Sequence, residues 1–337
     1  MLDWFPISGE NHYGHGMKAR DNPTLDKCKA PAGMTVVPGG TFTMGSDRFY
    51  PEERPTRQVC VDSFYMDEAP VTNAEFSRFV AETGHVTFAE IAPDPRDYPD
   101  MPPEMAQPGS AVFRPTPYPV DTSDPSQWWR FEFGADWRHP YGPDSSIDGL
   151  EDHPVVHVAF DDAKAYAKWA GKTLPTEAEW ERAARGGLEC VEYAWGEELS
   201  PGGRIMAKTW QGLFPSQNLA TDGWHRTAPV RSYDANGFGL YDMIGNVWEW
   251  TTDWYAMPQV EKKRGSCCIP ANPRGPRKHD SFDPASPARI PRKVLKGGSH
   301  LCAPNYCQRY RPAARHPEPI DTTTSHVGFR CIVRRPT

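Results

Sequence analysis

Proline is the feature that most limits what this chain can fold into. It supplies 36 of the 337 residues, about twice the usual share of ~5%. Because proline has no backbone N–H, it cannot donate a hydrogen bond inside a helix or a sheet. We therefore expect short helices and strands joined by long ordered loops. The 12 Trp residues supply large, rigid side chains for the core of such a loop-rich fold.

Charge and hydropathy argue against several classes of protein. Hydrophobic residues make up 38% of the chain and charged residues 24%, which is enough apolar material for a core and too little charge for disorder. The net charge of −7 argues against nucleic acid or an anionic membrane as a partner. No apolar run reaches the ~18 residues of a transmembrane helix, and the N-terminal segment lacks the features of a secretory signal peptide. We therefore expect no membrane partner and a location in the cytoplasm.

Local motifs predict three helices. Thr72 and Thr176 each stand three residues before a glutamate, which is the capping-box pattern that opens a helix. The first of these helices is expected to end before Gly84, a residue that suits the position just after a helix C-terminus. The remaining helix is expected from about Asp161 to Ala170.

Alternating apolar residues predict several strands. Residues 34–45 are expected to form a hairpin with Pro-Gly-Gly at its bend, and residues 59–66 and 326–333 are expected to form single strands. Residues 86–150 are rich in proline and aromatic residues, so we expect a long ordered loop region there. Residues 1–33 are polar and irregular and are expected to form an N-terminal extension.

Cys302 and Cys307 form a Cys-x4-Cys loop with Pro304 between them, and this spacing can aim two sulfurs at one point. Soft thiolates bind Cu(I), zinc or iron–sulfur centres. Structural zinc takes four protein ligands, so two local thiols suit a low-coordinate ion such as Cu(I). The spacing also leaves open a redox-active disulfide, a structural disulfide, or two buried free thiols.

Five stretches of the chain, among them residues 137–145, resemble the sulfatase-modifying factor family. Three of them, Gly171–Glu181, Gly239–Trp250 and Gly328–Cys331, resemble segments that occur throughout that family, so they indicate the fold more than the activity. The discriminating stretch is Gly297–Arg315, which resembles the active-site segment of the formylglycine-generating enzymes and contains both cysteines. The resemblance extends over about residues 34–334.

This resemblance implies a fold and an activity. The fold is α+β with low regular secondary structure, related to the C-type lectins, and it would form one domain over residues 34–337 after the extension of residues 1–33. The activity is an O2-using, copper-dependent oxidation. It converts the cysteine of a sulfatase Cys-x-Pro-x-Arg motif to Cα-formylglycine, through loss of a β-hydrogen and hydrolysis of a thioaldehyde. The sulfatase then uses the aldehyde hydrate as its nucleophile.

The resemblance also implies roles for individual residues. Cys302 and Cys307 would hold Cu(I), with the sulfatase cysteine as a third sulfur ligand, and Ser299 and Tyr306 match residues that line this site. His326 stands where relatives have an asparagine in the substrate cleft.

Three arginines follow the cysteine pair, namely Arg309, Arg311 and Arg315. A guanidinium near a thiol lowers the pKa of that thiol. The other interpretation is that these arginines hold the loop by hydrogen bonds to backbone carbonyls. The sequence leaves both interpretations open.

Calcium is a further implication of the resemblance. Asp242, Gly245, Val247 and Glu249 match a family site made of two side chains and two backbone carbonyls. All four positions offer oxygen, which Ca²⁺ prefers. Gly245 and Asn246 favour a turn, and a turn can fold the two carboxylates back around one ion.

A second calcium site of the family is expected to be lost here. Asp222 and Trp224 match its ligands, but Lys208 replaces a side-chain oxygen. An ammonium cannot coordinate a cation, so we expect it to pair with Asp222 in the place of the ion. The expectation is therefore one bound calcium.

Cysteine partners are also missing relative to secreted relatives, which carry two structural disulfides. Ala167 and Ala184 each stand where one partner would be, and Pro312 replaces another cysteine. Cys331 is therefore expected to be a buried free thiol, which agrees with a reducing compartment.

Two other functions compete with this interpretation. His153 and His157 have a spacing that suggests a non-haem iron oxygenase, akin to the sulfoxide synthases of the same fold. However, Ala159 stands where the iron triad needs a carboxylate. A non-catalytic, lectin-like binding module is the other alternative. Family members of that kind lack the cysteine pair, so Cys302 and Cys307 argue against it.

Overall fold

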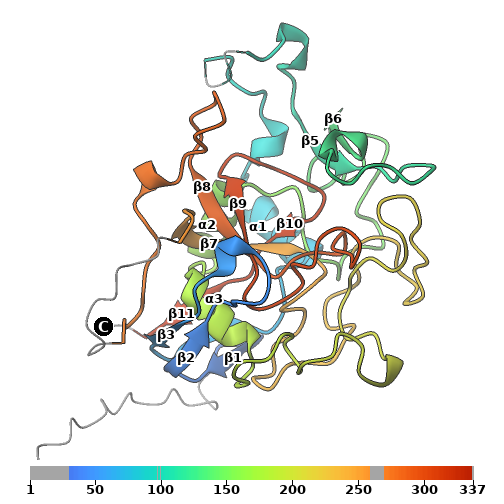
Figure 1. Cartoon of the computed structure of the whole chain (residues 1–337). Helices are drawn as coiled ribbons and strands as arrows, with labels where there is room; N and C mark the ends of the chain where they lie inside the picture. Colours follow the sequence, from blue (N-terminus) through green and yellow to red (C-terminus); the bar gives the residue numbers. More distant parts are fainter. Residues whose placement is uncertain (1–29, 97, 99, 259–268, 336–337) are drawn as a thin grey trace, which may run out of the picture.

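Four small sheets form the frame of the domain in the computed structural model (Figure 1), which describes residues 30–96, 98, 100–258 and 269–335. The first sheet has the order β1-β4-β11, with β1 at Met34–Val37, β4 at Phe64–Asp67 and β11 at Ile332–Arg334. The second has the order β10-β7-β8-β9, with β10 at Val327–Gly328, β7 at Trp248–Trp254, β8 at Arg292–Lys296 and β9 at Arg315–Pro319. The two remaining sheets are the pairs β2 (Gly40–Met44) with β3 (Arg57–Val61), and β5 (Gly109–Phe113) with β6 (Trp129–Phe133).

The two ends of the described chain meet in one sheet. β4 pairs antiparallel with β1 on one side, where Val36 faces Tyr65. On its other side it pairs with β11, where Val333 also faces Tyr65. The predicted hairpin over residues 34–45 is therefore wrong, because β1 and β2 lie in different sheets and β2 pairs with β3 instead.

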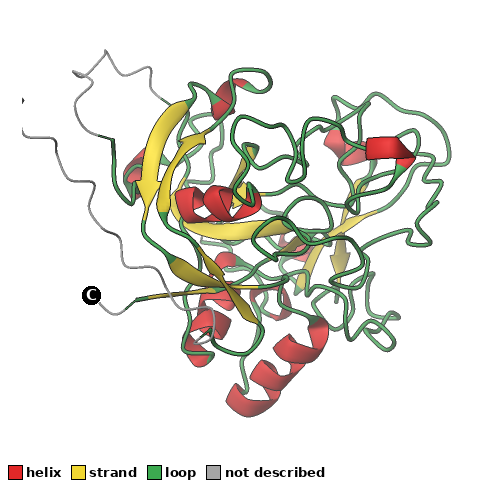
Figure 2. Ribbon diagram, turned by 90° about the horizontal axis from the view of Figure 1, so that it is seen from below, coloured by secondary structure: helices red, strands yellow, loops and turns green. Residues whose placement is uncertain are grey.

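Two further strand predictions also need correction. The single strand expected over residues 59–66 is two strands, β3 and β4, which belong to different sheets. The expected closing strand is likewise divided into β10 and β11. The region 86–150 is not only loop, because it contains the antiparallel pair β5 and β6. Long loops still dominate the picture in Figure 2, as the proline content predicts.

The three predicted helices are present. They are α1 at Asn73–Thr83, α2 at Phe160–Trp169 and α3 at Glu177–Ala184. The capping boxes of Thr72 with Glu75 and of Thr176 with Glu179 both form. α1 ends at Gly84 with a left-handed φ of 68°, as expected for glycine at this position.

Several of the short 3₁₀ turns begin with proline, because the first N–H of such a turn has no hydrogen-bond partner within the turn. Four of the turns start in this way, at Pro51–Glu53, Pro103–Met105, Pro125–Gln127 and Pro201–Gly203. Two others lie at Phe88–Glu90 and Lys278–Asp280. In the described part of the chain, no helix has both the length and the apolar character needed to cross a membrane.

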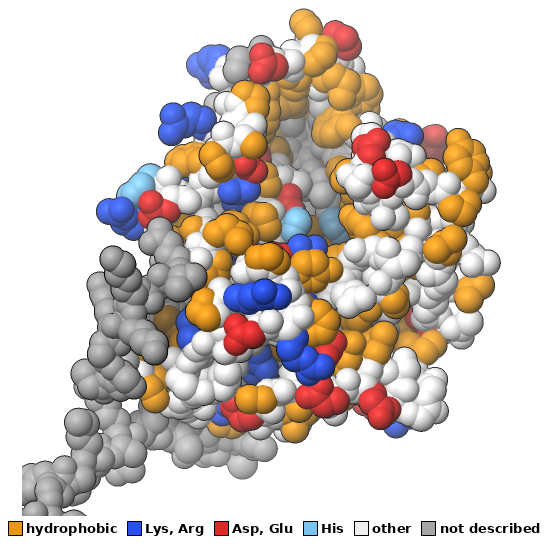
Figure 3. Space-filling model, viewed as in Figure 1, with side chains coloured by type: hydrophobic (Ala, Val, Ile, Leu, Met, Phe, Trp, Pro, Cys, Tyr) orange, Lys and Arg blue, Asp and Glu red, His pale blue; other side chains and the backbone are white. Residues whose placement is uncertain are grey.

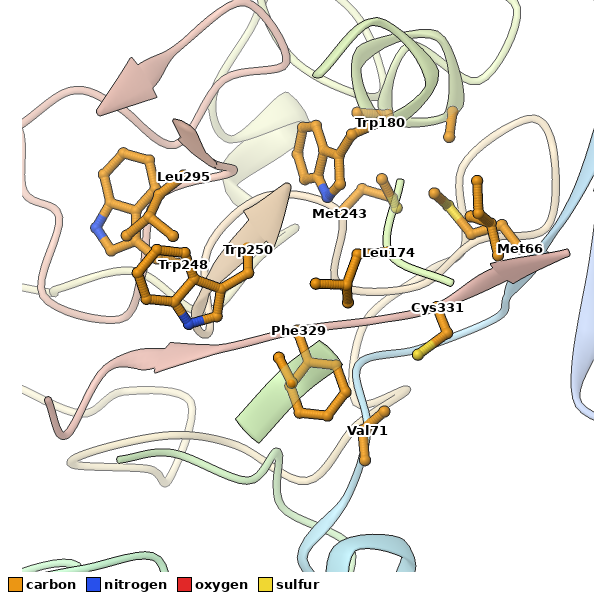
Figure 4. Close-up of a cluster of buried hydrophobic side chains, with 14 of the residues drawn as sticks. Met66, Val71, Leu174, Trp180, Met243, Trp248, Trp250, Leu295, Phe329 and Cys331 are labelled. Atoms are coloured by element: carbon orange, nitrogen blue, oxygen red, sulfur yellow. The ribbon is translucent and has the colours of Figure 1, made fainter. Parts of the chain in front are cut away.

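The core lies between α3, β7, β8 and the C-terminal strands (Figure 4). Trp180 of α3 and Trp250 of β7 are both fully buried, and the Trp250 indole donates to the carbonyl of Val158 at 2.9 Å. Phe329 and Cys331 belong to the same cluster. Cys331 is 0% exposed and free, which confirms the prediction of a buried free thiol.

Candidate active site

Cys302 and Cys307 bring their sulfurs together at the surface of this core. The two Sγ atoms lie 3.3 Å apart, too far for a disulfide bond of ~2.05 Å. Cys302 is 2% exposed and Cys307 is 8% exposed. The amides of Tyr306 and Cys307 both donate to the carbonyl of Ala303, at 3.0 and 2.9 Å, so a tight turn fixes the spacing. The prediction that this loop aims two sulfurs at one point is confirmed.

Two glycines make room for the strand that enters this loop. Gly297 and Gly298 have φ values of 93° and 73°, a region that other residues rarely adopt. A Cβ atom on Gly298 would lie 2.8 Å from the carbonyl oxygen of Arg309, and one on Gly297 would lie 3.0 Å from the ring of Trp180. Glycine at both positions therefore allows the loop to pack against α3 and against its own continuation.

The two thiols are electrostatically unequal. A hydrogen bond from Cys302 and the nearby Arg309 lower the pKa of Cys307 to about 6, whereas burial raises the pKa of Cys302 well above its ordinary value. The Arg309 Nη1 atom lies 3.9 Å from the Cys307 sulfur. At neutral pH the pair is therefore a Cys307 thiolate that accepts a hydrogen bond from a Cys302 thiol.

Arg309 is held in place by residues from the opposite end of the chain. Its Nη2 atom donates to Glu52 at 2.6 Å, and its guanidinium stacks on the ring of Tyr50 with a separation of 3.9 Å. The Tyr50 hydroxyl accepts a hydrogen bond from the amide of Gln308 at 3.0 Å. These contacts keep the guanidinium beside the sulfur of Cys307.

The other two arginines have structural roles. Arg311 is 1% exposed and donates from Nη1 to the carboxylate of Glu53 at 2.8 Å. Arg315 donates to Glu177 at 2.9 Å and to the carbonyl of Ala256 at 3.1 Å. Of the two interpretations left open by the sequence, the effect on thiol pKa applies to Arg309, and the fixing of the loop applies to Arg311 and Arg315.

Ser299 and Tyr306 both lie beside the cysteine pair but differ in exposure. Ser299 is 0% exposed, and its amide donates to the sulfur of Cys302 at 3.4 Å. Tyr306 is 37% exposed and stacks on Phe214 with ring centroids 4.3 Å apart. Burial raises the pKa of Tyr306 to about 12, so its hydroxyl stays protonated and can donate a hydrogen bond.

His326 is half-buried, and its ring centroid lies 4.8 Å from that of Trp129. Its Nδ1 atom is 2.6 Å from the hydroxyl of Thr324, and burial lowers its pKa well below the ordinary value. The ring is therefore neutral at pH 7. Figure 3 shows that this view of the molecule has a hollow with histidine side chains at its base.

The four residues of the predicted calcium site lie in and after one turn. Asp242, Gly245 and Asn246 all have left-handed φ values, of 54°, 80° and 56°, so the segment is not helical. Burial raises the pKa of Asp242 to about 6, and the carboxylate of Glu249 adds to this effect. The two buried carboxylates and the carbonyls of Gly245 and Val247 offer oxygen, the kind of ligand that Ca²⁺ prefers.

Arg330 is a contact of this cluster that the sequence did not indicate. It is fully buried and donates from Nε to both carboxylate oxygens of Glu249, at 3.0 and 2.8 Å. Trp180 donates to Glu249 as well, at 2.7 Å. The charge of Glu249 is thus already balanced, and the less satisfied carboxylate of the cluster is that of Asp242.

At the other predicted calcium position, Lys208 occupies the centre. Its Nζ lies 3.1 and 3.0 Å from the two carboxylate oxygens of Asp222, and it also donates to the carbonyl of Trp224. Tyr233 completes the cluster with a hydrogen bond to Asp222 at 2.7 Å. The expected pairing of the ammonium with Asp222 is confirmed.

The histidines that suggested an iron site are structural. The Nδ1 atom of His153 is 2.9 Å from Thr227, and His157 contacts Ser110 at 2.6 Å and the carbonyl of Pro140 at 2.9 Å. Burial lowers the pKa of both rings. Across the described residues, no three His, Cys, Asp or Glu side chains form a metal-binding group.

Alkylation of the metal-free protein is expected to modify Cys307 before Cys302. Only the thiolate is nucleophilic, and the pKa of Cys307 is lowered to about 6 while that of Cys302 is raised. The labelling rate of Cys307 should therefore rise with pH through about 6 and then level off, as measured by peptide mapping after brief exposure to iodoacetamide. Arg309→Gln is expected to move this midpoint upward. Faster labelling of Cys302 would contradict the assignment.

Solved structures support the fold. The structure of PvdO from Pseudomonas aeruginosa aligns with a TM-score of 0.59 at 22% sequence identity, covering 93% of this chain and 98% of that one. Treponema denticola variable protein 1 aligns with a TM-score of 0.53 at 17% identity, covering 90% and 95%. At these identities the likeness concerns the fold alone, and it agrees with the predicted α+β class of low regular structure.

Other proteins have much higher sequence identity to this chain than these solved structures have. The formylglycine-generating enzyme of Mycobacterium tuberculosis is 53% identical over 89% of this chain and 97% of that protein, and the enzyme of Mus musculus is 42% identical over 88% and 74%. A bovine protein named inactive C-alpha-formylglycine-generating enzyme 2 is 40% identical over 88% and 87%. Residues 20–335 match the Sulfatase-modifying factor enzyme 1-like domain. The chain therefore belongs to the sulfatase-modifying factor family, whose similar members include the formylglycine-generating enzymes.

Proposed function

We propose that this chain generates formylglycine by oxidising the cysteine of a sulfatase Cys-x-Pro-x-Arg segment, with Cu(I) held by Cys302 and Cys307 and with O2 as the oxidant. The observation that carries the proposal is the pair of free, buried sulfurs 3.3 Å apart. An inactive relative shares the family, so family membership alone does not decide activity. The cysteine pair is the feature on which catalysis depends.

The donor set fits a soft, low-coordinate ion. The two sulfurs lie in contact, and the pKa of Cys307 is lowered to about 6 by a hydrogen bond from Cys302 and by the nearby Arg309, so this sulfur is a thiolate at neutral pH. Thiolates bind Cu(I), zinc and iron–sulfur centres, and a pair of sulfurs without two further protein ligands suits Cu(I) better than four-coordinate zinc. When bound, Cu(I) would supply one-electron chemistry with O2 and an open position for the sulfur of the substrate.

The surrounding residues would organise the reaction. Burial of Cys302 and Cys307 excludes water from the sulfurs, and the amide of Ser299 directs a hydrogen bond to Cys302. Tyr306 is 37% exposed and keeps its hydroxyl protonated, so it would be available to donate a hydrogen bond to a bound peptide. His326, which is neutral and whose ring lies tilted against that of Trp129, would offer a ring nitrogen to a peptide in place of an asparagine amide.

Mass spectrometry of a peptide that contains Cys-x-Pro-x-Arg tests this function directly. Incubation with copper-loaded protein in air should lower the peptide mass by the difference between a CH2–SH group and an aldehyde. The same mixture without O2 should leave the peptide unchanged. An unmodified peptide in air, with copper bound to the protein, would contradict the proposal.

We also propose a reducing, cytoplasmic location, supported by the same cysteines. Cys302, Cys307 and Cys331 are free thiols among the described residues, and Cys331 is fully buried. Free thiols of this kind are typical of compartments in which glutathione keeps cysteine reduced.

We also propose that one calcium ion binds at Asp242, Gly245, Val247 and Glu249. Binding to the native state raises stability by mass action, so a chelator is expected to lower the melting temperature of the protein. Replacing Glu249 by glutamine should reduce this sensitivity. The measurements are metal analysis of the purified protein and thermal unfolding with and without chelator.

Lys208→Asn provides the matched control for calcium. The substitution removes the ammonium that pairs with Asp222, which should allow a second calcium to bind there. The parent protein is expected to contain one calcium, because desolvating an ion beside a buried ammonium is costly. Two calcium ions per parent chain, or none at saturating calcium, would contradict the proposal.

A further inference from the structure

A cavity of about 500 Å³ lies between α2 and the strands β7 and β8, in a part of the molecule that the cysteine site does not use. It shares none of its lining residues with that site. Its lining has a single acidic residue, Asp161, and five lysines, which are Lys164, Lys168, Lys172, Lys278 and Lys293. Such a concentration of positive charge stands out in a chain with a net charge of −7.

Two of the five lysines are already neutralised. Lys172 pairs with Asp67, and the Nζ of Lys164 lies 3.7 Å from Asp161 across an exposed turn of α2. For the other three, no described carboxylate lies within the 4.0 Å of an ion pair. The cavity therefore carries three lysines without an ion-pair partner among the described residues.

The nearest buried acid is engaged elsewhere. Asp253 accepts hydrogen bonds from the amides of Glu177 at 2.7 Å and Gly275 at 2.9 Å. Its ion pair is with Arg274 at 3.8 Å, and its charge acts on Lys293 only from beyond ion-pair distance. This carboxylate thus stabilises two backbone turns, and it does not form an ion pair with a lysine of the cavity.

Lys293 differs from the other four lysines of the cavity because it is only 5% exposed. Its Nζ lies 3.3 Å from the ring centroid of Trp254 and 4.8 Å from that of Phe160, and it donates to the carbonyl of Thr252 at 2.5 Å. Contacts with aromatic rings only partly offset the cost of burying an ammonium. In agreement, burial lowers the pKa of Lys293 to about 8.

The cavity has the size and the walls of a small-molecule site. Its volume lies within the ~300–1,000 Å³ of typical ligand pockets, and Leu174, Ile320 and the rings of Phe160 and Trp254 form apolar walls. Lysine binds phosphate and similar oxyanions as a point charge. We propose that this cavity binds a small organic anion that bears a phosphate or sulfate group, with Lys293 at its base and Lys168 and Lys278 at its rim.

Calorimetric titration of the full-length, metal-free protein with phenyl phosphate and with phenyl sulfate tests the proposal. The two probes share an aromatic ring and differ in the anion, so they distinguish the two sources of the oxyanion. We expect saturable binding of at least one probe with one site per chain. Lys293→Met, and separately the exposed pair Lys168→Gln with Lys278→Gln, should each weaken binding at least about tenfold.

Arg204→Gln is the control for net charge, because Arg204 is an exposed cation outside the cavity. It removes one positive charge and should leave the affinity for the probes unchanged. The proposal would be overturned if both probes failed to bind at about 10 mM, which is ten times the ~1 mM dissociation constant of a weak site. Equal weakening by Arg204→Gln, or tighter binding of an acidic peptide than of both probes, would overturn it as well.

Discussion

Replacement of either Cys302 or Cys307 by serine is expected to abolish oxidation of a Cys-x-Pro-x-Arg peptide. Serine keeps the size of the side chain but removes a soft sulfur donor, and a single remaining sulfur would not hold Cu(I) tightly. Mass spectrometry of the peptide measures the loss, and copper content measured in parallel shows whether the metal site has gone.

Cys190→Ser is the matched control for this prediction, because Cys190 is an exposed free cysteine and lies outside the site. It should retain full activity and copper binding. Circular dichroism should show that all three variants fold. Full turnover by Cys302→Ser or Cys307→Ser with substoichiometric copper would rule out joint ligation by the pair.

Arg311→Met is expected to destabilise the domain by about 3–5 kcal/mol, the usual effect of removing one partner of a buried ion pair. Arg311 and Glu53 are each 1% exposed, so the substitution leaves the carboxylate of Glu53 buried without its cation. Methionine retains much of the side-chain volume, which separates the loss of charge from the loss of packing. Urea unfolding monitored by tryptophan fluorescence measures the change.

Arg48→Met is the control for Arg311→Met. Arg48 also pairs with glutamates, at 3.2 Å from Glu192 and 3.0 Å from Glu197, but its side chain is 62% exposed. Water already solvates this guanidinium, so its removal should leave the unfolding midpoint close to that of the parent protein. Equal destabilisation by the two substitutions would show that burial of the Arg311 pair does not decide its contribution.

Several local features followed from the sequence because their contacts lie within a few residues. The capping boxes of Thr72 and Thr176 form as predicted, since a threonine side chain reaches the third following amide without help from other segments. The sulfurs of Cys302 and Cys307 meet for a similar reason, because a single turn closes the five-residue spacing. The low content of regular structure followed from proline, which cannot donate its part of a hydrogen-bond ladder.

Strand pairing did not follow from local pattern. Residues 34–37 and 40–44 alternate as a hairpin would, yet β1 pairs with β4 and, through it, shares a sheet with β11 from the far end of the chain. Alternation shows which face of a strand is buried but not which strand lies beside it. Which strand pairs with β1 depends instead on which strand packs against the same part of the core.

For the site, the cysteine pair and the nearby arginines were predictable from the sequence, and the contacts that hold those arginines in place were not. The sequence determined the low-regularity α+β fold, the capped helices, the sulfur pair, and the pairing of Lys208 with Asp222. Only the tertiary structure placed Glu52 and Tyr50 against Arg309, Arg330 against Glu249, and five lysines around one cavity. The physical reason is that local geometry depends on sterics and hydrogen bonds between near neighbours. Contacts between distant segments form only where folding buries their surfaces together.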